Sequence, residues 1–534
     1  MKEGVEMRII LPCFITCLLL STQSSAELID LTLSSSDEQL TAFSQLQSLR
    51  YIHHPELVTV PDVHELKNKF LVRSLFVESN DLPMIDIQLT FNAGSSRDQE
   101  IGAELYGLAN MAAQLMDEGT TKYSAEEIIS TFESVGAKLS VTAYKDMFVV
   151  KLRVLSDPEK YEPALAMMLE VLKQANFRSS GIQLVLSNTE IGQKQLKENP
   201  GRMKNIVFYR SLYAKHPYAE PTTGTQASIR KIRPKDLVQF RKQFLVRNNL
   251  NIAITGNLTV KQAQRLAEKI TDKLPAGIKA PPLPAPIVQS QFNIRHIPYP
   301  SSQAHVVMGE IVTTRHDPDY LALQLANRIF GSGGFNSILS KELRVKRGLT
   351  YGAYSNFSFM QVAGPFSLGY STEQQHLLET IQIAHKALVD FVNQPMDPKQ
   401  FEEAKQGLLL SFPNSYSSNA AMNAQLGSMG FYGLPSNYLN QYSEQLSKLT
   451  IEQVQHAVRK HLHPDRLTLV IFSSTLDKTK LNQILNLNLT SNSALPEVRQ
   501  APAIDELHPP KPETPSPVTA PHDRPALISN NDQL

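Results

Sequence analysis

The sequence contains no tryptophan and almost no cysteine. Its two cysteines, Cys13 and Cys17, both fall within the first twenty of 534 residues. The rest of the chain therefore offers no disulfide, no thiolate nucleophile and no cysteine-based metal site. Cysteine catalysis is excluded.

A large net charge of either sign is also missing. The chain has 52 basic and 51 acidic side chains, which leave a formal charge of +1. No global field therefore draws the protein to nucleic acid or to an anionic membrane. With 42% hydrophobic and 19% charged residues, the composition indicates a globular chain of several domains rather than a fibrous or wholly disordered one.

Long hydrophobic runs are absent after the N-terminus, so no later segment is predicted to span a membrane. The N-terminal segment has Lys2 and Arg8, an apolar run from Ile9 to Leu20, and small residues up to Ala26. This pattern predicts a secretory signal peptide over residues 1–26 and a periplasmic location. A mature chain without cysteine suits an oxidising compartment. A retained membrane anchor is the alternative.

Proline-rich segments divide the chain. Residues 274–290, which begin with LPAGIKAPPLPAP at 274–286, have the composition of an extended linker. Residues 491–534 are rich in proline and lack apolar periodicity, which predicts a disordered tail. The predicted organisation is an N-terminal extension at 27–48 and two domains at 49–273 and 291–490.

The two domains repeat each other. KIRPKDLVQFRKQFLVRNNLNIAI, from Lys231, aligns without gaps to KLTIEQVQHAVRKHLHPDRLTLVI, from Lys448. Each segment is predicted as a helix, a turn and an apolar strand. The simplest fold is α+β, with two homologous domains that each have a mainly antiparallel sheet covered by helices on one face.

A strand followed by a helix is also predicted earlier in each domain. The apolar strands are expected at residues 84–91 and 305–312, and the helices at 103–116 and 320–330.

The segment from Phe91, FNAGSSRDQEIGAELYGLANMAAQLMDEGTTKYSAEEIISTFESVGAKL, carries a recognisable frame. Its Gly-Ser-Ser-Arg-Asp, Gly-Leu-Ala, Gly-Thr and Phe-x-x-x-Gly-Ala elements resemble the M16 (pitrilysin or insulinase) peptidase family. In active members the helix after Gly-Leu-Ala carries the zinc motif His-x-x-Glu-His. The matching positions here hold Asn110, Ala113 and Gln114. For this helix alone, a core-packing helix with a chance Gly-Leu-Ala start is the alternative.

These replacements remove the chemistry of the motif. Two imidazoles four residues apart can both reach zinc, and the intervening carboxylate can take a proton from the bound water. Asn110 and Gln114 are poor zinc ligands, and Ala113 has no basic group. The resemblance places a third ligand at Glu190, but one carboxylate does not hold a catalytic zinc. We expect this chain to bind neither a metal nor another cofactor.

A second family segment, from Ile329, is IFGSGGFNSILSKELRVKRGLTYGAYSNFS. M16 peptidases carry an arginine and a tyrosine seven residues apart here, which correspond to Arg344 and Tyr351. The resemblance implies that both face the zinc and donate to the substrate carbonyl and its oxyanion. A surface charge and a half-buried strand residue are the alternatives for the two.

The start of the same segment resembles the glycine-rich loop of the non-catalytic subunit of the mitochondrial processing peptidase, which favours a role in guiding extended peptide. A flexible connection between helices is the alternative. The candidate substrate-binding residues are Gly331, Ser332, Gly333, Gly334 and Phe335.

The resemblance extends from about Leu57 to Ser474 and implies two domains that form half of a clam shell. In the two-chain branch of the family, one chain supplies zinc and its partner supplies the arginine and tyrosine. This chain resembles that partner, which implies a zinc-bearing M16 subunit as its partner and unfolded peptide as substrate. The alternatives are a peptide-binding or scaffold protein without a role in hydrolysis, and a zinc peptidase that acts alone.

The remaining histidines show no zinc spacing. His216 precedes Pro217 and is predicted to be a turn residue. His461 and His463 are predicted to be solvated surface residues, because the sequence shows no carboxylate pair near them.

Overall fold

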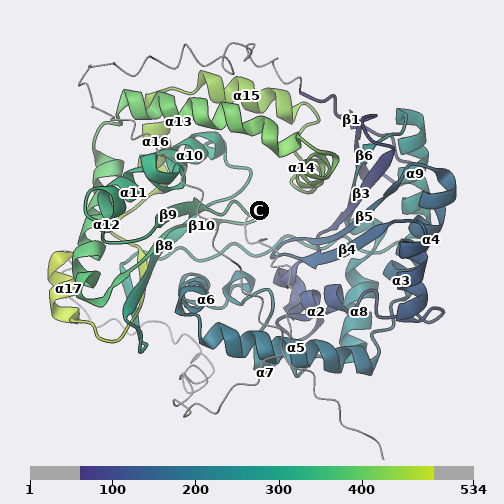
Figure 1. Ribbon diagram of the computed structural model, residues 1–534, viewed down its shortest axis with the longest axis horizontal. Helices are drawn as coiled ribbons and strands as arrows, with labels where there is room; N and C mark the ends of the chain where they lie inside the picture. The colour runs from purple at the N-terminus through teal and green to yellow at the C-terminus, as the bar shows by residue number, and fades with distance from the viewer. Residues whose placement is uncertain (1–59, 486–534) are drawn as a thin grey trace, which may run out of the picture. The chain divides into compact units, whose positions relative to one another are not determined.

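The computed structural model describes residues 60–485 (Figure 1). The predicted signal peptide, the N-terminal extension, the tail and both cysteines lie outside the described residues. Among the helices of residues 60–485, none has the length and apolar character needed to cross a membrane.

The first repeat, residues 64–273, contains a six-stranded sheet with the order β1-β2-β6-β3-β5-β4 (Figure 1). β2 and β6 are parallel, and the other neighbours are antiparallel. The strands are β1 (His64–Glu65), β2 (Arg73–Glu78), β3 (Met84–Phe91), β4 (Lys138–Ala143), β5 (Phe148–Leu155) and β6 (Leu250–Gly256). The helices are α1 (Asp98–Ile101), α2 (Leu108–Gln114), α3 (Ala125–Ser134), α4 (Pro158–Gln174), α5 (Ser179–Lys197), α6 (Pro200–Tyr213), α7 (Gln226–Ile229), α8 (Pro234–Phe244) and α9 (Val260–Lys273).

The second repeat, residues 293–484, contains a five-stranded sheet with the order β7-β11-β8-β10-β9. The strands are β7 (Asn293–Pro298), β8 (Gln303–Thr313), β9 (Ala353–Phe357), β10 (Gly364–Glu373) and β11 (Thr468–Ser473). The helices are α10 (Tyr320–Asn327), α11 (Ile338–Ser340), α12 (Leu377–Asn393), α13 (Pro398–Ser411), α14 (Asn419–Phe431), α15 (Tyr438–Lys448), α16 (Ile451–His461) and α17 (Lys478–Ile484).

The two sheets have the same topology, which confirms the predicted α+β repeat. The order β2-β6-β3-β5-β4 corresponds strand by strand to β7-β11-β8-β10-β9. In both sheets the first of these neighbouring pairs is parallel and the others are antiparallel. The two segments that align in the sequence form α8 with β6 and α16 with β11.

Each repeat also gives one helix to the sheet of the other. α14 packs against β2, β3 and β6, and α6 packs against β8 and β11. Successive strand side chains point to opposite faces. Accordingly, Phe76 of β2 belongs to the core formed with the helices of its own repeat, whereas Leu75 and Val77 belong to the core that includes Met422 of α14. The prediction of helices on one face is therefore incomplete.

Glycine allows the close approach of α14. A Cβ atom on Gly427 would lie 1.9 Å from Nε2 of Gln88 on β3. Asn423, one helical turn earlier, donates from Nδ2 to the carbonyl of Asp86 at 2.8 Å. A polar contact as well as apolar burial thus holds α14 against the sheet of the first repeat.

Lys204 places a buried ammonium group in the equivalent contact of α6. Its side chain is 3% exposed, and Nζ donates to the carbonyls of Val306 on β8 and Tyr370 on β10 at 3.1 and 3.4 Å. Burial lowers the pKa of Lys204 to about 8. His305 lies nearby, and burial together with the charge of Lys204 lowers the pKa of this histidine to about 4.

Substitution of Lys204 by methionine is expected to stabilise the protein at neutral pH. The pKa of Lys204 falls from 10.5 to about 8 on folding. Between about pH 8 and pH 10.5 the unfolded chain therefore binds more protons than the folded chain, and the stability of the wild type rises with pH. Below pH 8 the desolvation cost is present in full, at most about 3 kcal/mol. After the loss of two hydrogen bonds, we expect Lys204→Met to raise the free energy of unfolding by about 1–2 kcal/mol at about pH 7.

Urea unfolding at about pH 7 and about pH 9.5 measures this effect, and the advantage of the variant should shrink at the higher pH. Lys215→Met is the matched control, because Lys215 is exposed and its loss should change little. A Lys204→Met protein that is less stable than the wild type at both pH values would contradict the expectation.

Two helices are shorter than the sequence predicts. The helix expected at 103–116 is α2, Leu108–Gln114, which starts after Gly107 with a φ of 94°. The helix expected at 320–330 is α10, Tyr320–Asn327, which continues as a π-helical turn, Arg328–Ser332. At α2 the left-handed backbone of Gly107 sets the start of the helix. Apolar periodicity in the sequence does not report such a conformation, so the predicted helix began too early.

Candidate functional site

The N-terminus of α2 is capped by a carboxylate from outside the helix. Asp98 is 1% exposed. Its Oδ2 accepts from the N–H groups of Gly107 and Leu108 at 2.8 and 3.2 Å, and its Oδ1 accepts from Ala109 at 2.9 Å. Burial raises the pKa of Asp98 to about 7, although these three donors act in the opposite direction. The Asp of the Gly-Ser-Ser-Arg-Asp motif thus fixes where α2 begins.

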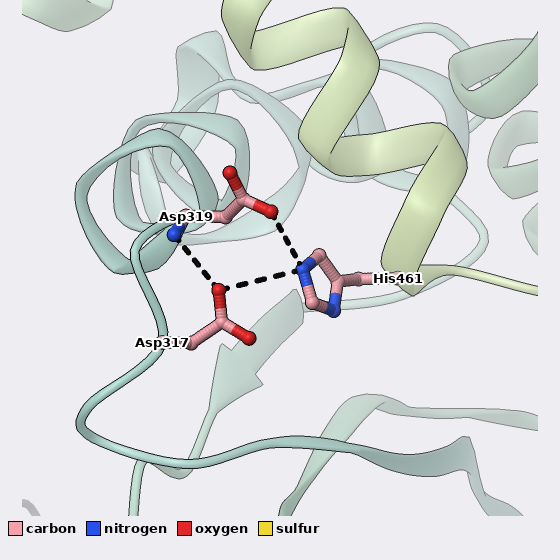
Figure 2. A group of neighbouring side chains, drawn as sticks. All are labelled: Asp317, Asp319 and His461. Carbon is pink, nitrogen blue, oxygen red and sulfur yellow. Dashed lines mark hydrogen bonds and ion pairs between the residues drawn. The ribbon is translucent and has the colours of Figure 1, made fainter.

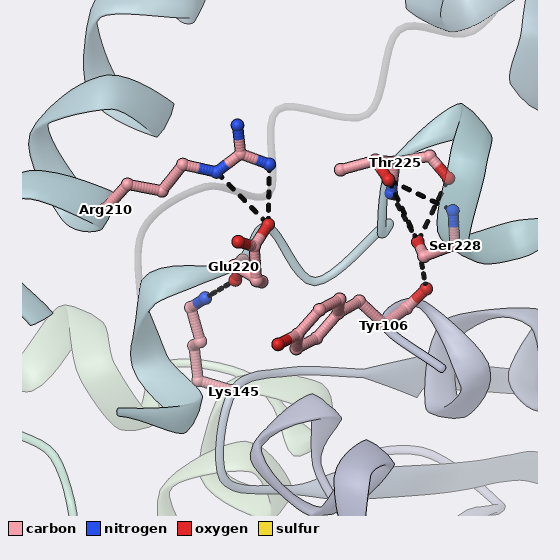
Figure 3. Close-up of polar contacts among 6 residues, drawn as sticks. All are labelled: Tyr106, Lys145, Arg210, Glu220, Thr225 and Ser228. Atoms are coloured by element: carbon pink, nitrogen blue, oxygen red, sulfur yellow. Dashed lines mark hydrogen bonds and ion pairs between the residues drawn. The ribbon is translucent and has the colours of Figure 1, made fainter. Parts of the chain in front are cut away.

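The loop at residues 221–225 packs against the chain just before α2 (Figure 3). Gly224 has a φ of 70°, and a Cβ atom there would lie 2.2 Å from the carbonyl oxygen of Tyr106. Thr225 and Ser228 form a capping box at the start of α7. The Ser228 hydroxyl also donates to the Tyr106 carbonyl at 2.7 Å. This loop therefore contacts the backbone of Tyr106, two residues before α2 begins.

Charged side chains anchor the other end of this loop (Figure 3). Arg210 of α6 donates to one carboxylate oxygen of Glu220 from Nε and a terminal nitrogen, at 3.2 and 2.6 Å. Lys145, in the turn between β4 and β5, donates to the Glu220 carbonyl. Burial lowers the pKa of Lys145 to about 8, against the effect of nearby carboxylates. The scaffold around α2 is thus built from several segments of the first repeat.

This scaffold presents a helix face without zinc ligands. Asn110 is half-buried and Gln114 exposed, one turn apart on α2, whereas Ala113 is buried. Glu190 lies on α5, which packs against α2. Arg230 donates to a single oxygen of Glu190 at 2.6 and 3.0 Å, and this hydrogen bond lowers the pKa of Glu190.

The donor set does not fit zinc. Two amides and a methyl group replace the imidazoles and the base, and the remaining carboxylate already carries a guanidinium counter-ion. Arg230 was not predicted from the sequence, because it lies forty residues beyond Glu190 and has no motif around it. A cation paired with Glu190 would oppose the approach of a divalent metal.

Arg344 and Tyr351 lie in the second repeat. Arg344 belongs to a π-helical turn, Lys341–Val345, and its carbonyl accepts from the Gly348 N–H at 2.8 Å. Tyr351 precedes β9 and is 85% exposed, so it is not the half-buried strand residue considered as an alternative. The neighbouring Thr350 is buried and donates to the Ser371 carbonyl at 2.6 Å. A phenol on an anchored backbone is therefore presented to solvent.

The cations around Arg344 differ in their partners. Glu342 accepts from Lys346 at 2.5 Å and from Arg347 at 2.7 Å. Between the described residues, no ion pair joins Arg344 to a carboxylate. Its guanidinium instead lies 4.4 Å from the centroid of the Phe335 ring. Unlike Lys346 and Arg347, Arg344 thus has donors that Glu342 does not take up.

The glycine-rich loop is packed rather than free. Gly331 is buried, and a Cβ atom there would lie 2.3 Å from the Ser355 hydroxyl. On Gly333 a Cβ atom would lie 2.4 Å from the Arg328 carbonyl oxygen. Gly334 has a φ of 63° with open space around it. The glycines therefore permit close contact and a turn, whereas Ser332 and Phe335 are exposed.

The two sets of candidate residues remain separate. Asn110, Ala113 and Gln114 on α2 and Glu190 on α5 belong to the first repeat, whereas the glycine-rich loop and Arg344 belong to the second. Over residues 60–485, no hydrogen bond or ion pair connects the sets. The second repeat therefore carries the candidate hydrogen-bond donors, and the first repeat carries the helix without metal ligands.

His461 does not lie on a solvated surface, so that prediction is wrong. It is 9% exposed, and its Nε2 lies 2.9 Å from Asp319 Oδ2 and 3.6 Å from Asp317 Oδ1 (Figure 2). The carboxylates come from the connection between β8 and α10, more than 140 residues away in the sequence. This distance is why the sequence showed no carboxylate pair.

Within the part of the chain that the structure describes, these three residues are one group with the composition of a metal site. Their atoms already have partners. Asp319 Oδ2 also accepts from Lys460 at 2.7 Å, and the two oxygens of Asp317 accept from the Asp319 N–H at 2.8 Å and the Thr313 hydroxyl at 2.5 Å. The cluster therefore fastens the end of α16 to the start of α10.

His463 likewise has an acidic partner. Its Nδ1 lies 3.2 Å from Glu310 Oε2, and its N–H donates to Oε1 at 2.5 Å. Glu310 is 3% exposed, and burial raises its pKa to about 8. His463 therefore joins the turn before β11 to β8. Its side chain is 32% exposed, so it is partly solvated as predicted, and the acidic partner is the feature that the sequence did not show.

His216 is a turn residue, as predicted. It caps a short 3₁₀-helix, Pro217–Ala219, and its Nδ1 accepts from the Tyr218 N–H at 3.1 Å. Its Nε2 donates to the carbonyl of Pro284 in the linker at 2.9 Å. Burial lowers the pKa of His216. Both ring nitrogens are occupied by backbone contacts.

A pocket of about 580 Å³ lies at the linker, and none of the predicted site residues lines it. The lining residues are Asn92, Lys279, Ala280, Pro281, Pro282, Leu283, His316, Gln361, Val362, Phe431 and Tyr432.

Two family models match the chain. Residues 74–226 match the insulinase (peptidase family M16) model, and residues 231–408 match the model named peptidase M16 inactive domain. These ranges contain α2, Glu190, the glycine-rich loop and Arg344.

Individual proteins support the same assignment. The chain is similar to the non-peptidase homolog YmxG of Helicobacter pylori, with 26% identity over 77% of this chain and 94% of that protein. It is 24% identical to an uncharacterized zinc protease of Rickettsia felis, over 65% of this chain and 82% of that protein. A crystal structure named peptidase M16 inactive domain, from Pseudomonas fluorescens, matches with 34% identity and a TM-score of 0.74, over 78% of this chain and 98% of that chain.

Proposed function

Because the chain belongs to the M16 peptidase family, we propose that it is the zinc-free subunit of a two-chain peptidase whose other subunit is a zinc-bearing M16 chain. The substrate is an unfolded peptide. Arg344 and Tyr351 donate to the peptide carbonyl and to the oxyanion that develops when the partner's zinc-bound water attacks. The periplasm is the expected compartment, from the pattern of the first 26 residues.

One asymmetry carries the proposal. The α2 face has no imidazole or base, and Glu190 is paired with Arg230. In contrast, Arg344 has no carboxylate partner among the described residues, and the Tyr351 ring is 85% exposed. A chain with donors for an oxyanion but no means of generating the nucleophile needs a second chain that supplies it. The name of the Helicobacter relative, a non-peptidase homolog, agrees with the absence of an imidazole and a base on the α2 face.

Co-expression tests the proposal directly. The chain is produced alone and together with an M16 chain of the same genome that retains His-x-x-Glu-His, and cleavage of a carboxymethylated, unfolded protein is measured. We expect the pair to cleave at least about 100-fold faster than either chain alone, because each lacks an essential group. A chelator should abolish this activity. An equal rate for the zinc-bearing chain with and without this subunit would refute the proposal.

A peptide-binding protein without a role in hydrolysis is the second candidate, favoured by the exposed aromatic rings of Phe335, Tyr351 and Tyr354 near β9. Calorimetric titration of the isolated chain with the unfolded protein separates the two. A pure binding protein would bind with the same affinity as its Tyr351→Phe variant and would not change the activity of a zinc-bearing chain.

A further inference from the structure

Phe335 covers the guanidinium of Arg344. The Arg344 Cζ atom lies 4.4 Å from the centroid of the Phe335 ring, within the range of a cation–π contact. Phe335 is nevertheless 61% exposed. An aromatic ring of this exposure adds little to a core, so its contact with Arg344 is the feature to be explained.

Hydrogen bonds hold the backbone on which Phe335 lies. Phe335 lies within a 3₁₀ turn, Gly334–Asn336. The hydroxyl and the N–H of Ser337 both donate to the Gly334 carbonyl, at 2.7 and 3.2 Å. Together with the close packing of Gly331 and Gly333, these contacts hold the loop from both ends. The backbone that carries the ring is therefore held in a defined position.

The ring contact leaves the hydrogen-bond donors of Arg344 unpaired. An aromatic ring offers no carbonyl or carboxylate oxygen, so a ring contact at Cζ does not pair the N–H groups of the guanidinium as a carboxylate would. These donors therefore remain available to a peptide carbonyl. A carboxylate partner would instead accept from these donors, as Glu342 accepts from Nη1 of Arg347 and from Lys346. Phe335 thus restricts Arg344 without using its hydrogen bonds.

We propose that Phe335 is a positioning residue, which holds the Arg344 guanidinium in the orientation that donates to the carbonyl of an extended peptide. This inference rests on the proposed function for the role of Arg344, but the stacking itself can be tested in the isolated chain. The glycine-rich loop then acts through Arg344. Its packed glycines set the height of the ring beneath the guanidinium.

In the reconstituted pair, Phe335→Leu is expected to lower kcat about five- to tenfold and to change KM less than about twofold, because an unrestrained arginine must be ordered in the transition state. Phe335→Tyr should restore kcat, since its ring can stack in the same way. In an Arg344→Ala background Phe335→Leu should have no further effect. Leu410→Ala, at a residue 73% exposed on α13, is the control for loss of a surface apolar group.

Modification of arginine by phenylglyoxal gives a readout without the partner. Mass spectrometry of the peptide that contains Arg344 should show faster modification in Phe335→Leu than in the wild type or Phe335→Tyr. Arg347 in the same peptide should not change. Unaltered modification of Arg344, or an unaltered kcat in Phe335→Leu, would overturn the inference. If Arg344→Ala itself leaves the pair fully active, the proposed function fails, while the modification experiment still decides whether the ring stacks.

Discussion

Replacement of Arg344 by alanine is expected to lower kcat of the two-chain peptidase about 100-fold, and Tyr351→Phe about tenfold or more, because a single preorganised donor to an oxyanion contributes on this scale. Neither side chain carries the fold. Tyr351 is 85% exposed, and Arg344 has a ring contact but no ion pair to a carboxylate among residues 60–485. The loss should therefore appear in cleavage and not in the free energy of unfolding.

Steady-state cleavage of an unfolded protein measures the loss of kcat, and the unfolding midpoint in urea measures the stability of each variant. Arg347→Ala is the matched control, since Arg347 is three residues away and is paired with Glu342 at 2.7 Å. It should leave kcat close to the wild-type value. If Arg344→Ala, Tyr351→Phe and Arg347→Ala all cleave at the wild-type rate, Arg344 and Tyr351 do not act in catalysis.

Strand positions could be predicted closely from the sequence, because apolar residues recur at close spacing within each short segment. The strands expected at 84–91 and 305–312 correspond to β3, Met84–Phe91, and β8, Gln303–Thr313. The alignment of the segments from Lys231 and Lys448 predicted the repeat. In both cases the signal is local, since periodicity within one element is sufficient.

The exchange of α6 and α14 could not be predicted in this way. Leu250–Gly256 alternates large apolar residues with Asn251, Ala253 and Thr255, so its sequence indicates one apolar face, although the structure buries almost the whole strand. That pattern does not say which helix covers the second face. The partner, α14, starts more than 160 residues later, and contact between them is set by the tertiary fold.

The candidate site shows the same limit. The loss of imidazoles at Asn110 and Gln114 is visible in the sequence, but the Arg230 counter-ion of Glu190 is not. The prediction for His461 failed for the same reason, because Asp317 and Asp319 come from another segment. Residue types at fixed spacing report the chemistry that a helix can offer, whereas the partners that modify it come from other segments.

Substitution of Gly224 by alanine is expected to destabilise the protein by about 3 kcal/mol, because two costs combine. The backbone has a φ of 70°, which costs an L-residue about 1 kcal/mol. The new Cβ atom would also lie 2.2 Å from the carbonyl oxygen of Tyr106, and a backbone clash of this kind costs about 1–3 kcal/mol to relieve. Movement of Tyr106 would disturb Gly107, where α2 begins.

Gly136→Ala separates the two costs. Gly136 has a φ of 65° in the same repeat, but no atom lies within 4 Å of its added Cβ. Its replacement should cost only the backbone term of about 1 kcal/mol. Urea unfolding of both variants measures the difference. Equal losses would show that the contact between the 221–225 loop and Tyr106 relaxes freely, and that this loop does not hold the start of α2 in place.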